Sequence, residues 1–89
     1  MHSTYSVELA SRKVEKQILS LLLKERNRVA ETIDNLGEAL YPHGVKKLAS
    51  NVYRIRIGRY RVIYEVDDSE KIVIVTKVVK RGEDTYSSF

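Results

Sequence analysis

The sequence lacks cysteine, has a single proline and contains no long apolar run. Without cysteine the chain can form neither a disulfide nor a thiolate metal site, which fits a reducing compartment. Its apolar runs, among them Leu21–Leu23 and Ile72–Val75, are far too short to cross a membrane or to form the core of a signal peptide. We therefore expect a soluble, cytoplasmic protein with no targeting segment.

Acidic residues are also missing from one long window of the chain. Between Ala39 and Tyr64 there is no Asp or Glu, although the whole chain has 12 acidic and 16 basic residues and a net charge of +4. The basic residues in this window are Lys46, Lys47, Arg54, Arg56, Arg59 and Arg61. Basic charge without interleaved acid is typical of an anion-binding surface, with nucleic acid the leading ligand. A solvated strand face would look the same, so charge alone leaves both interpretations open.

The chain is too short for more than one hydrophobic core. Its 89 residues allow one domain, predicted to span residues 1–89, and a domain of this size buries roughly 60 to 65% of its unfolded surface. The two histidines, His2 and His43, lie far apart in the sequence, and neither has a second histidine near it. We therefore predict no metal site.

The first half of the chain shows a strand pattern followed by two helical patterns. Apolar residues alternate over residues 5–9, as in a short strand. Ser11 is placed to cap a first helix with its hydroxyl. A second helix is predicted from about Lys24, with an apolar stripe that includes Leu36. Proline and glycine then end the helical pattern, and residues 41–51 are predicted to form a connection.

The second half of the chain is predicted to form a three-stranded meander. Apolar and polar side chains alternate over residues 53–57 and 60–66, with a tight turn at Gly58–Arg59. Residues 72–79 form a β-branched run that is apolar on both faces, as in a central strand. The order strand, helix, helix, strand, strand, strand predicts an α+β fold. We expect a mostly antiparallel sheet of about four strands, with the two N-terminal helices packed on one face.

Three arginines of the meander are predicted to share the other face of that sheet. Arg54 and Arg56 are two residues apart, so they point to the same side of their strand. Arg61 lies on the next strand, on the opposite side from Tyr60 and Val62. If the apolar sets of both strands pack on the helices, the three guanidinium groups point away from them together. Guanidinium groups bind phosphate oxygens in pairs and stay charged, so we predict an anion site here.

The segment Tyr53–Val66 reads YRIRIGRYRVIYEV and is similar to a block typical of RelE toxins, an aromatic residue followed by R-I-R-V-G-x-Y-R-V-I-Y. Lys46–Leu48 resembles the approach to that block, residues 24–36 resemble the second helix of the family, and residues 80–86 resemble its C-terminal motif. The match covers nearly the whole chain, and the central block is specific. The sequence thus resembles a toxin of the RelE/ParE superfamily, in the branch that cuts messenger RNA.

This resemblance implies a metal-independent endoribonuclease that cuts messenger RNA in the ribosomal A site, with the ribose 2′-OH attacking the adjacent phosphate. By position, Arg54 and Arg56 correspond to a basic pair of the family. Arg61 would stabilise the charged phosphorane-like state, Arg81 would assist it or the leaving oxygen, and Tyr86 would stack on the base beside the cut. Further RNA-binding residues are predicted at Lys46, Lys47, Arg59 and Lys80.

The chain departs from the best-known members of the family, which carry lysine where it has Arg54 and Arg56. A lysine can release its proton in such a site, whereas an arginine cannot, so these two residues are expected to position and stabilise charge rather than to transfer protons. The resemblance also implies a RelB-like antitoxin as partner, the ribosome as the place of action, no cofactor and no membrane.

Two other interpretations of the sequence stay open. A ParE-like toxin would share the fold and inhibit DNA gyrase without nuclease activity. An inactive module would bind its antitoxin or the ribosome and cut nothing, in keeping with the absence of an obvious acid–base residue. The set Arg54, Arg56, Arg61, Arg81 and Tyr86 favours the nuclease.

Overall fold

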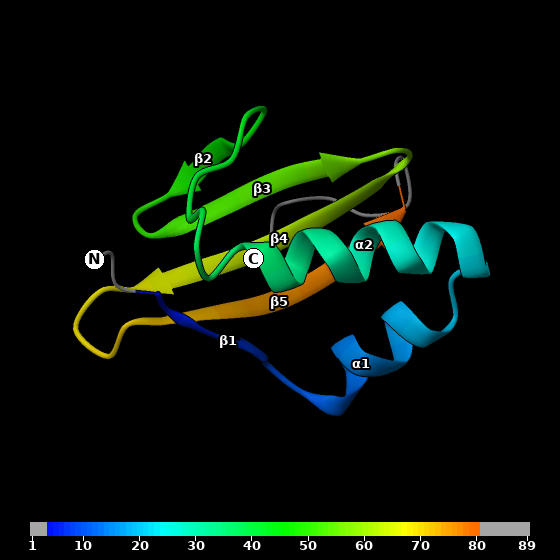
Figure 1. Cartoon of the computed structure of the whole chain (residues 1–89), viewed down its shortest axis with the longest axis horizontal. Coiled ribbons are helices and arrows are strands. Elements are labelled where there is room, and N and C mark those ends of the chain that lie inside the picture. The colour runs from blue at the N-terminus through cyan, green and yellow to red at the C-terminus, as the bar shows by residue number, and fades with distance from the viewer. Residues whose placement is uncertain (1–3, 81–89) are drawn as a thin grey trace.

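The computed structural model describes residues 4–80, which form a sheet of five strands and two helices (Figure 1). The elements are β1 Ser6–Leu9, α1 Arg12–Leu19, α2 Leu23–Asn35, β2 Lys46–Ala49, β3 Val52–Ile57, β4 Tyr60–Asp67 and β5 Ile72–Lys80. The strand order is β1-β5-β4-β3-β2, and only β1 and β5 run parallel. The predicted α+β class and the mostly antiparallel sheet are confirmed.

The sheet has a fifth strand because the expected connection over residues 41–51 contains β2. This strand has four residues, and its register with β3 shifts between Lys47 and Ala49. It lies at the edge of the sheet and carries two exposed lysines, a common feature of edge strands that avoid pairing with other chains. Two lysines and an irregular register leave no clean alternation, so the sequence pattern did not reveal β2 as a strand.

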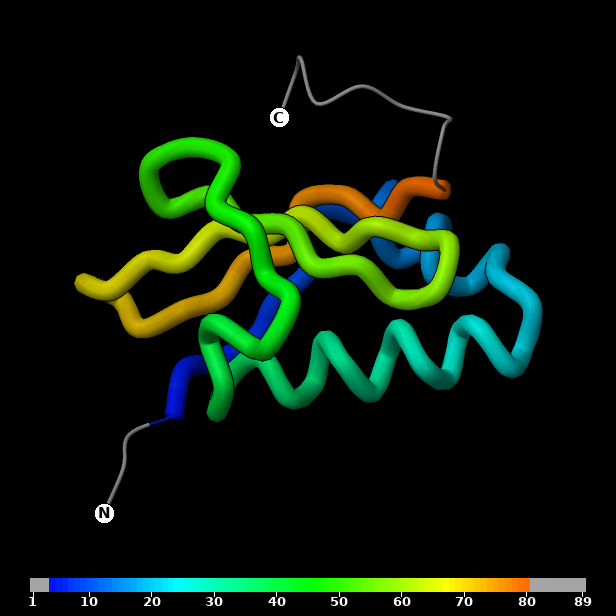
Figure 2. The backbone as a smooth tube through the Cα atoms, turned by 90° about the horizontal axis from the view of Figure 1, so that it is seen from above, coloured from blue at the N-terminus to red at the C-terminus, as the bar shows by residue number. Residues whose placement is uncertain are grey.

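The α2 helix runs along one face of the sheet (Figure 2), and the hydrophobic core lies between them. Val29 and Ile33 form the buried stripe of α2, and Leu36 at its C-cap continues this stripe, as the spacing of the apolar residues predicted. The sheet contributes its alternate apolar residues, among them Val62 and Tyr64, which are fully buried. The side chains between them in sequence point to the opposite face, because successive residues of a strand alternate. The residues of that second face are the ones that bear on function.

The α1 helix lies beside β5 where that strand extends past the end of β1 (Figure 1). The last residue of β1 pairs with Val75, so the following part of β5 has no strand neighbour on this side within the described residues. Gln17 of α1 provides a hydrogen-bond partner in place of a strand, because its Oε1 accepts a hydrogen bond of 3.1 Å from the backbone N–H of Val78. Ser11 occupies the N-cap position of α1, but its hydroxyl makes no capping hydrogen bond. Among residues 4–80 no helix has the length and apolarity that crossing a membrane requires.

Two contacts hold the segment after α2 against the sheet. The buried hydroxyl of Tyr64 donates a hydrogen bond of 2.6 Å to the carbonyl of Leu40. Burial is the main cause that raises the pKa of Tyr64 above its usual value, so the hydroxyl stays protonated and keeps donating. The backbone of Gly37 lies against Tyr5, which donates its N–H to the Gly37 carbonyl, and any Cβ at position 37 would collide with the Tyr5 carbonyl. Glycine is therefore required here by close approach.

We predict that Leu36→Ala lowers the free energy of unfolding by about 2 to 5 kcal/mol, because Leu36 is only 1% exposed and its truncation leaves a cavity. Urea denaturation followed by circular dichroism measures the change. Leu22→Ala is the matched control, since Leu22 is 67% exposed, and it should shift stability by less than about 0.5 kcal/mol. Equal effects of the two variants would contradict the described packing of α2.

Candidate functional site

The register between β3 and β4 brings the three predicted arginines onto one face of the sheet. Arg56 pairs directly with Arg61, and Arg54 pairs with Ile63. Their chain neighbours Ile55 and Val62 pair with each other and are buried in the core on the side of α2. The alternation of the sequence predicted this shared face, and it lies opposite the core.

Two lysines join the arginines on that face. Lys46 of β2 pairs with Arg54, and Lys77 of β5 pairs with Ile63. We call the surface formed by Lys46, Arg54, Arg56, Arg61 and Lys77 the basic face. It receives residues from four consecutive strands of the sheet, so its charges are held on the most regular part of the fold.

Sequence reasoning missed Lys77 because of an irregularity in β5. Val73 and Val75 point into the core, so simple alternation would send Lys77 there too. The pairing with β4 shifts between Ile63 and Tyr64, leaving Thr76 as an extra residue, and its hydroxyl donates a hydrogen bond of 3.2 Å to the carbonyl of Ile63. This bulge reverses the alternation, so that Val78 is buried in the core and Lys77 points to the basic face. In the sequence, only the occurrence of a lysine within a β-branched run indicated that the alternation of β5 is interrupted.

The basic face places like charges close together, which is costly for a surface with only a structural role. Arg56 is exposed and Arg61 is half-buried, and neither forms an ion pair with a carboxylate of residues 4–80. Arginines directly opposite each other in a sheet destabilise the pair. The Nε of Arg61 is buried and makes no hydrogen bond to any group in the described part of the chain. An arriving anion would relieve both the repulsion and the missing hydrogen bond.

Burial differs among the arginines of this face in a way that suits an anion site. Arg54 is only 9% exposed, so its side chain is held in place by its surroundings. Arg56, two residues further along β3 on the same face, is exposed to solvent. Arg61 is half-buried on β4, which lies between β3 and β5 in the sheet. It therefore combines a fixed position with access from solvent. Fixed cations aimed at a place where negative charge develops stabilise it without reorganising.

Acidic residues lie on the same sheet face toward the C-terminal end of β4, and they limit how far a bound anion can extend along it. Glu65 lies two residues after Ile63 on β4, and Asp67 follows at the end of the strand. The Asp67 carboxylate accepts hydrogen bonds from the backbone N–H groups of Ser69 and Glu70 and from the Ser69 hydroxyl. These bonds, led by the Ser69 hydroxyl, lower the pKa of Asp67, so it stays ionised. A polyanion is therefore favoured only over the half of the face that carries the arginines.

The other predicted site residues lie elsewhere. The register places Lys47 opposite Tyr53 and Lys80 opposite Tyr60, on the side of the sheet that packs against α2. Arg59, in the turn between β3 and β4, forms a 2.9 Å ion pair with Glu25 of α2. Arg81 and Tyr86 lie outside the described residues.

The ion pair of Arg59 attaches the tip of the β3–β4 hairpin to α2. Glu25 accepts from Arg59 Nε and, at 3.2 Å, from the Tyr60 hydroxyl. The Arg59 hydrogen bond is the main cause that lowers the pKa of Glu25 below its usual value. Arg59 is therefore committed to the helix side of the sheet, and its role in this structure is to hold the hairpin.

We predict that Arg56→Gln stabilises the folded protein by about 0.2 to 1 kcal/mol, because it removes the repulsion between Arg56 and Arg61. Urea denaturation at low salt measures the gain, which should shrink as salt screens the charges. Arg12→Gln changes an exposed arginine of α1 in the same way and should leave stability unchanged. A marked loss of stability in Arg56→Gln would show that Arg56 has a structural partner.

We predict that Glu25→Gln destabilises the protein at neutral pH and that the difference from the unaltered chain disappears in acid. The folded pKa of Glu25 is lowered, so its ionised form stabilises the fold above the unfolded pKa, and this contribution is lost as pH falls through the folded pKa. Thermal melting between about pH 7 and pH 2 measures the effect. Glu31→Gln, which alters an exposed carboxylate on the same helix, is the control. A difference that stays constant over this range would contradict the ion pair.

Comparisons with known proteins agree with this geometry. Residues 8–85 match the model of the family described as ParE toxin of the type II toxin–antitoxin system, parDE. The structure is similar to a chain in the archaeal RelE–RelB complex from Pyrococcus horikoshii OT3, with 33% identity, a TM-score of 0.81, and coverage of 91% of this chain and 99% of that one. No curated protein sequence matches the chain.

More distant solved structures share the fold. The isolated RelE toxin of E. coli has 21% identity and a TM-score of 0.76 over 94% of this chain and 92% of that one. A chain in the RelBE2 toxin–antitoxin complex of Mycobacterium tuberculosis has 22% identity and a TM-score of 0.73, covering 88% and 99%. The family match over most of the length and the archaeal likeness decide the assignment: this chain belongs to the RelE/ParE superfamily and is a toxin of a type II toxin–antitoxin system.

Proposed function

We propose that this toxin is an endoribonuclease that cuts messenger RNA bound in the ribosomal A site and so inhibits translation in the cytoplasm. The observation that carries the proposal is the direct pairing of Arg56 with Arg61 on the basic face, where Arg61 has a buried Nε that lacks a hydrogen bond within residues 4–80. A face built only for solubility would not set like charges opposite each other beside a buried, unsatisfied donor. An RNA phosphate supplies what both residues lack.

The reaction proposed for this face is an internal transesterification, in which the phosphoryl group moves from the 5′-oxygen of one nucleotide to the 2′-oxygen of the preceding ribose. The ribose 2′-oxygen attacks the adjacent phosphorus and loses its proton, the bond from phosphorus to the 5′-oxygen breaks, and that oxygen takes up a proton. The products are a 2′,3′-cyclic phosphate and a free 5′-hydroxyl. Arg61 stabilises the additional negative charge on the phosphorane-like state, and Arg54 and Arg56 hold the phosphate in place. The proposal also assigns assistance at the leaving oxygen to Arg81 and stacking on the neighbouring base to Tyr86.

The partner proposed for this chain is a RelB-like antitoxin. The archaeal relative with 33% identity was solved as a RelE–RelB complex, which supports a partner of the same kind here. We expect the antitoxin to cover the basic face and to supply acidic side chains, because that surface carries repelling cations. Covering it would neutralise Arg56 and Arg61 and block access for RNA at the same time.

A second function is favoured by one specific finding. The family model that matches residues 8–85 is that of the ParE toxins, whose members need not be nucleases. A ParE-like toxin would inhibit DNA gyrase through protein contacts. The paired arginines of the basic face support the nuclease over this alternative, since protein contacts with gyrase do not require a cross-strand pair of like charges beside a buried Nε that lacks a hydrogen bond within residues 4–80.

Primer extension on a defined messenger in a reconstituted translation system tests the proposal. We expect the unaltered toxin to produce cuts that depend on ribosomes, and Arg61→Ala to reduce cutting by about 100-fold or more, the usual effect of removing a group that stabilises the transition state. Arg12→Ala is the matched control, because it removes an exposed arginine of α1 that is not among the residues of the basic face. It should cut like the unaltered toxin.

Each of the other outcomes of this experiment would indicate a different site or a different function for this chain. Full cutting by a folded Arg61→Ala variant would contradict the assignment of the basic face. If the unaltered toxin cuts nothing but still arrests growth, a supercoiling assay with purified gyrase becomes decisive. No cutting and no growth arrest would identify a module that binds its antitoxin without activity.

A further inference from the structure

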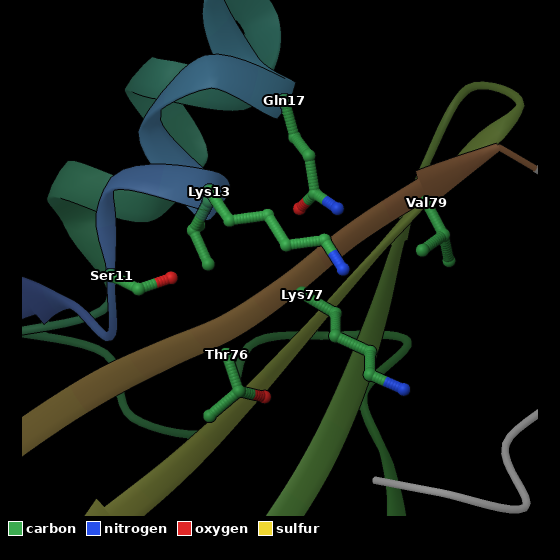
Figure 3. A pocket seen from close by; sticks show the side chains of 7 residues that line it. Ser11, Lys13, Gln17, Thr76, Lys77 and Val79 are labelled. Carbon is green, nitrogen blue, oxygen red and sulfur yellow. The ribbon is translucent and has the colours of Figure 1, made fainter.

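A second basic site lies next to the basic face, in an open pocket of about 370 Å³ between α1 and β5 (Figure 3). The pocket forms where β5 continues beyond the last residue of β1 and the helix replaces the missing strand. Gln17 joins the two elements through its hydrogen bond to the Val78 backbone. The position of the pocket therefore follows from the unequal lengths of the parallel strands β1 and β5.

The lining of this pocket is polar and positively charged. Lys13 and Gln17 of α1, Ser11 at the N-cap of that helix, and Thr76 and Lys77 of β5 line it, and no acidic residue of the range 4–80 does. In Figure 3 the side chains of Lys13 and Gln17 reach from the helix toward β5, and the side chain of Lys77 leaves β5 on the side away from the helix. The ammonium groups of Lys13 and Lys77 give the pocket a positive lining, which favours an anion.

Hydrogen-bond donors are oriented in the same pocket. Because Gln17 Oε1 accepts from the Val78 N–H, the amide NH₂ of Gln17 remains as a directed donor. The Ser11 hydroxyl stands at the N-cap position without bonding to the helix backbone, so it is not committed there. The Thr76 hydroxyl donates to the Ile63 carbonyl and can only accept from a ligand. The pocket thus offers charge from two lysines and donors from α1.

The pocket is continuous with the proposed RNA site. Lys77 lines the pocket and also belongs to the basic face. Val79 lines the pocket as well, and it is the cross-strand partner of Arg61. Neighbouring strands lie about 4.8 Å apart, so the pocket begins one strand away from the guanidinium assigned to the reacting phosphate. A polyanion that occupies Arg61 can therefore reach the pocket within the same strand of RNA.

We propose that this pocket binds a second phosphate of the RNA strand that is cut, with Lys13 and Lys77 neutralising its charge and Gln17 and Ser11 donating hydrogen bonds. The proposal rests on the proposed function, because it takes the same RNA strand as ligand. Acidic Glu65 and Asp67 close the opposite end of the sheet face, so the strand leaves the basic face past β5 and α1. Lys13 then defines how many nucleotides beyond the cut the toxin contacts.

Binding of fluorescent oligoribonucleotides to the full chain tests this site. The probes have a 2′-deoxy nucleotide at the intended cut, which removes the attacking hydroxyl, and are either about three or about nine nucleotides long. We expect Lys13→Gln to weaken binding of the long probe and to reduce its slope of log affinity against log salt by about 0.7, the value for one lost phosphate contact on a single strand. The short probe should bind Lys13→Gln and the unaltered chain equally.

Lys16→Gln is the matched control, because Lys16 is an exposed lysine of α1 that does not line the pocket. It should change neither probe, and equal melting temperatures of both lysine variants exclude a folding defect. If Lys13→Gln and Lys16→Gln both bind the long probe like the unaltered chain while Arg61→Ala weakens it, the pocket proposal fails and the proposed function stands. If the unaltered chain binds neither probe, the pocket proposal fails, and the proposed function is decided by the ribosome-dependent cutting described above.

Co-sedimentation with empty ribosomes separates the substrate from ribosomal RNA, which has the same phosphates. A Lys13→Gln variant that sediments less with ribosomes but binds the long probe normally would overturn the proposal, because the pocket would then serve ribosomal RNA. Unchanged co-sedimentation together with weakened binding of the long probe supports a phosphate of the cut strand.

Discussion

The antiparallel register between β3 and β4 is the constraint on which the site depends. It places Arg56 opposite Arg61 and sends Ile55 and Val62 into the core from the same pair of strands. A slip of one residue would move the arginines into the core and the apolar residues into solvent, so burial of the core enforces the arrangement of the site. Gly58 helps to set this register, since its φ of +60° at the first position of the two-residue turn suits a type II′ hairpin.

The two faces of the sheet divide stability and function between them. The face against α2 buries apolar side chains, and its hairpin is held by Glu25 and Arg59. The opposite face accumulates cations, which repel one another when nothing is bound. A chain of this size has little stability to spare. The compact core beneath the sheet therefore limits how many cations the other face can carry, and a tightly bound acidic partner would add stability through binding to the folded form.

The sequence predicted those features that follow from regular alternation and missed those that depend on its interruption. Strands β3 and β4 and the shared face of their arginines follow from the period of two in residues 53–66. Strand β2 and the placement of Lys77 depend on register shifts, which have no recognisable signature in the amino-acid sequence. The pairing of Arg59 with Glu25 joins residues 34 positions apart, so no local pattern in the sequence predicted this ion pair.

The parallel pairing of β1 with β5 has a consequence for how this toxin is made. These strands come from the two ends of the described chain, and β5 lies between β1 and β4 in the finished sheet. During synthesis the N-terminal strand emerges first and has no partner until the residues of β5 have followed it. Contacts between distant segments also form slowly. The sheet face that carries the cations is thus completed only after β5, the last strand of the described chain, has been made.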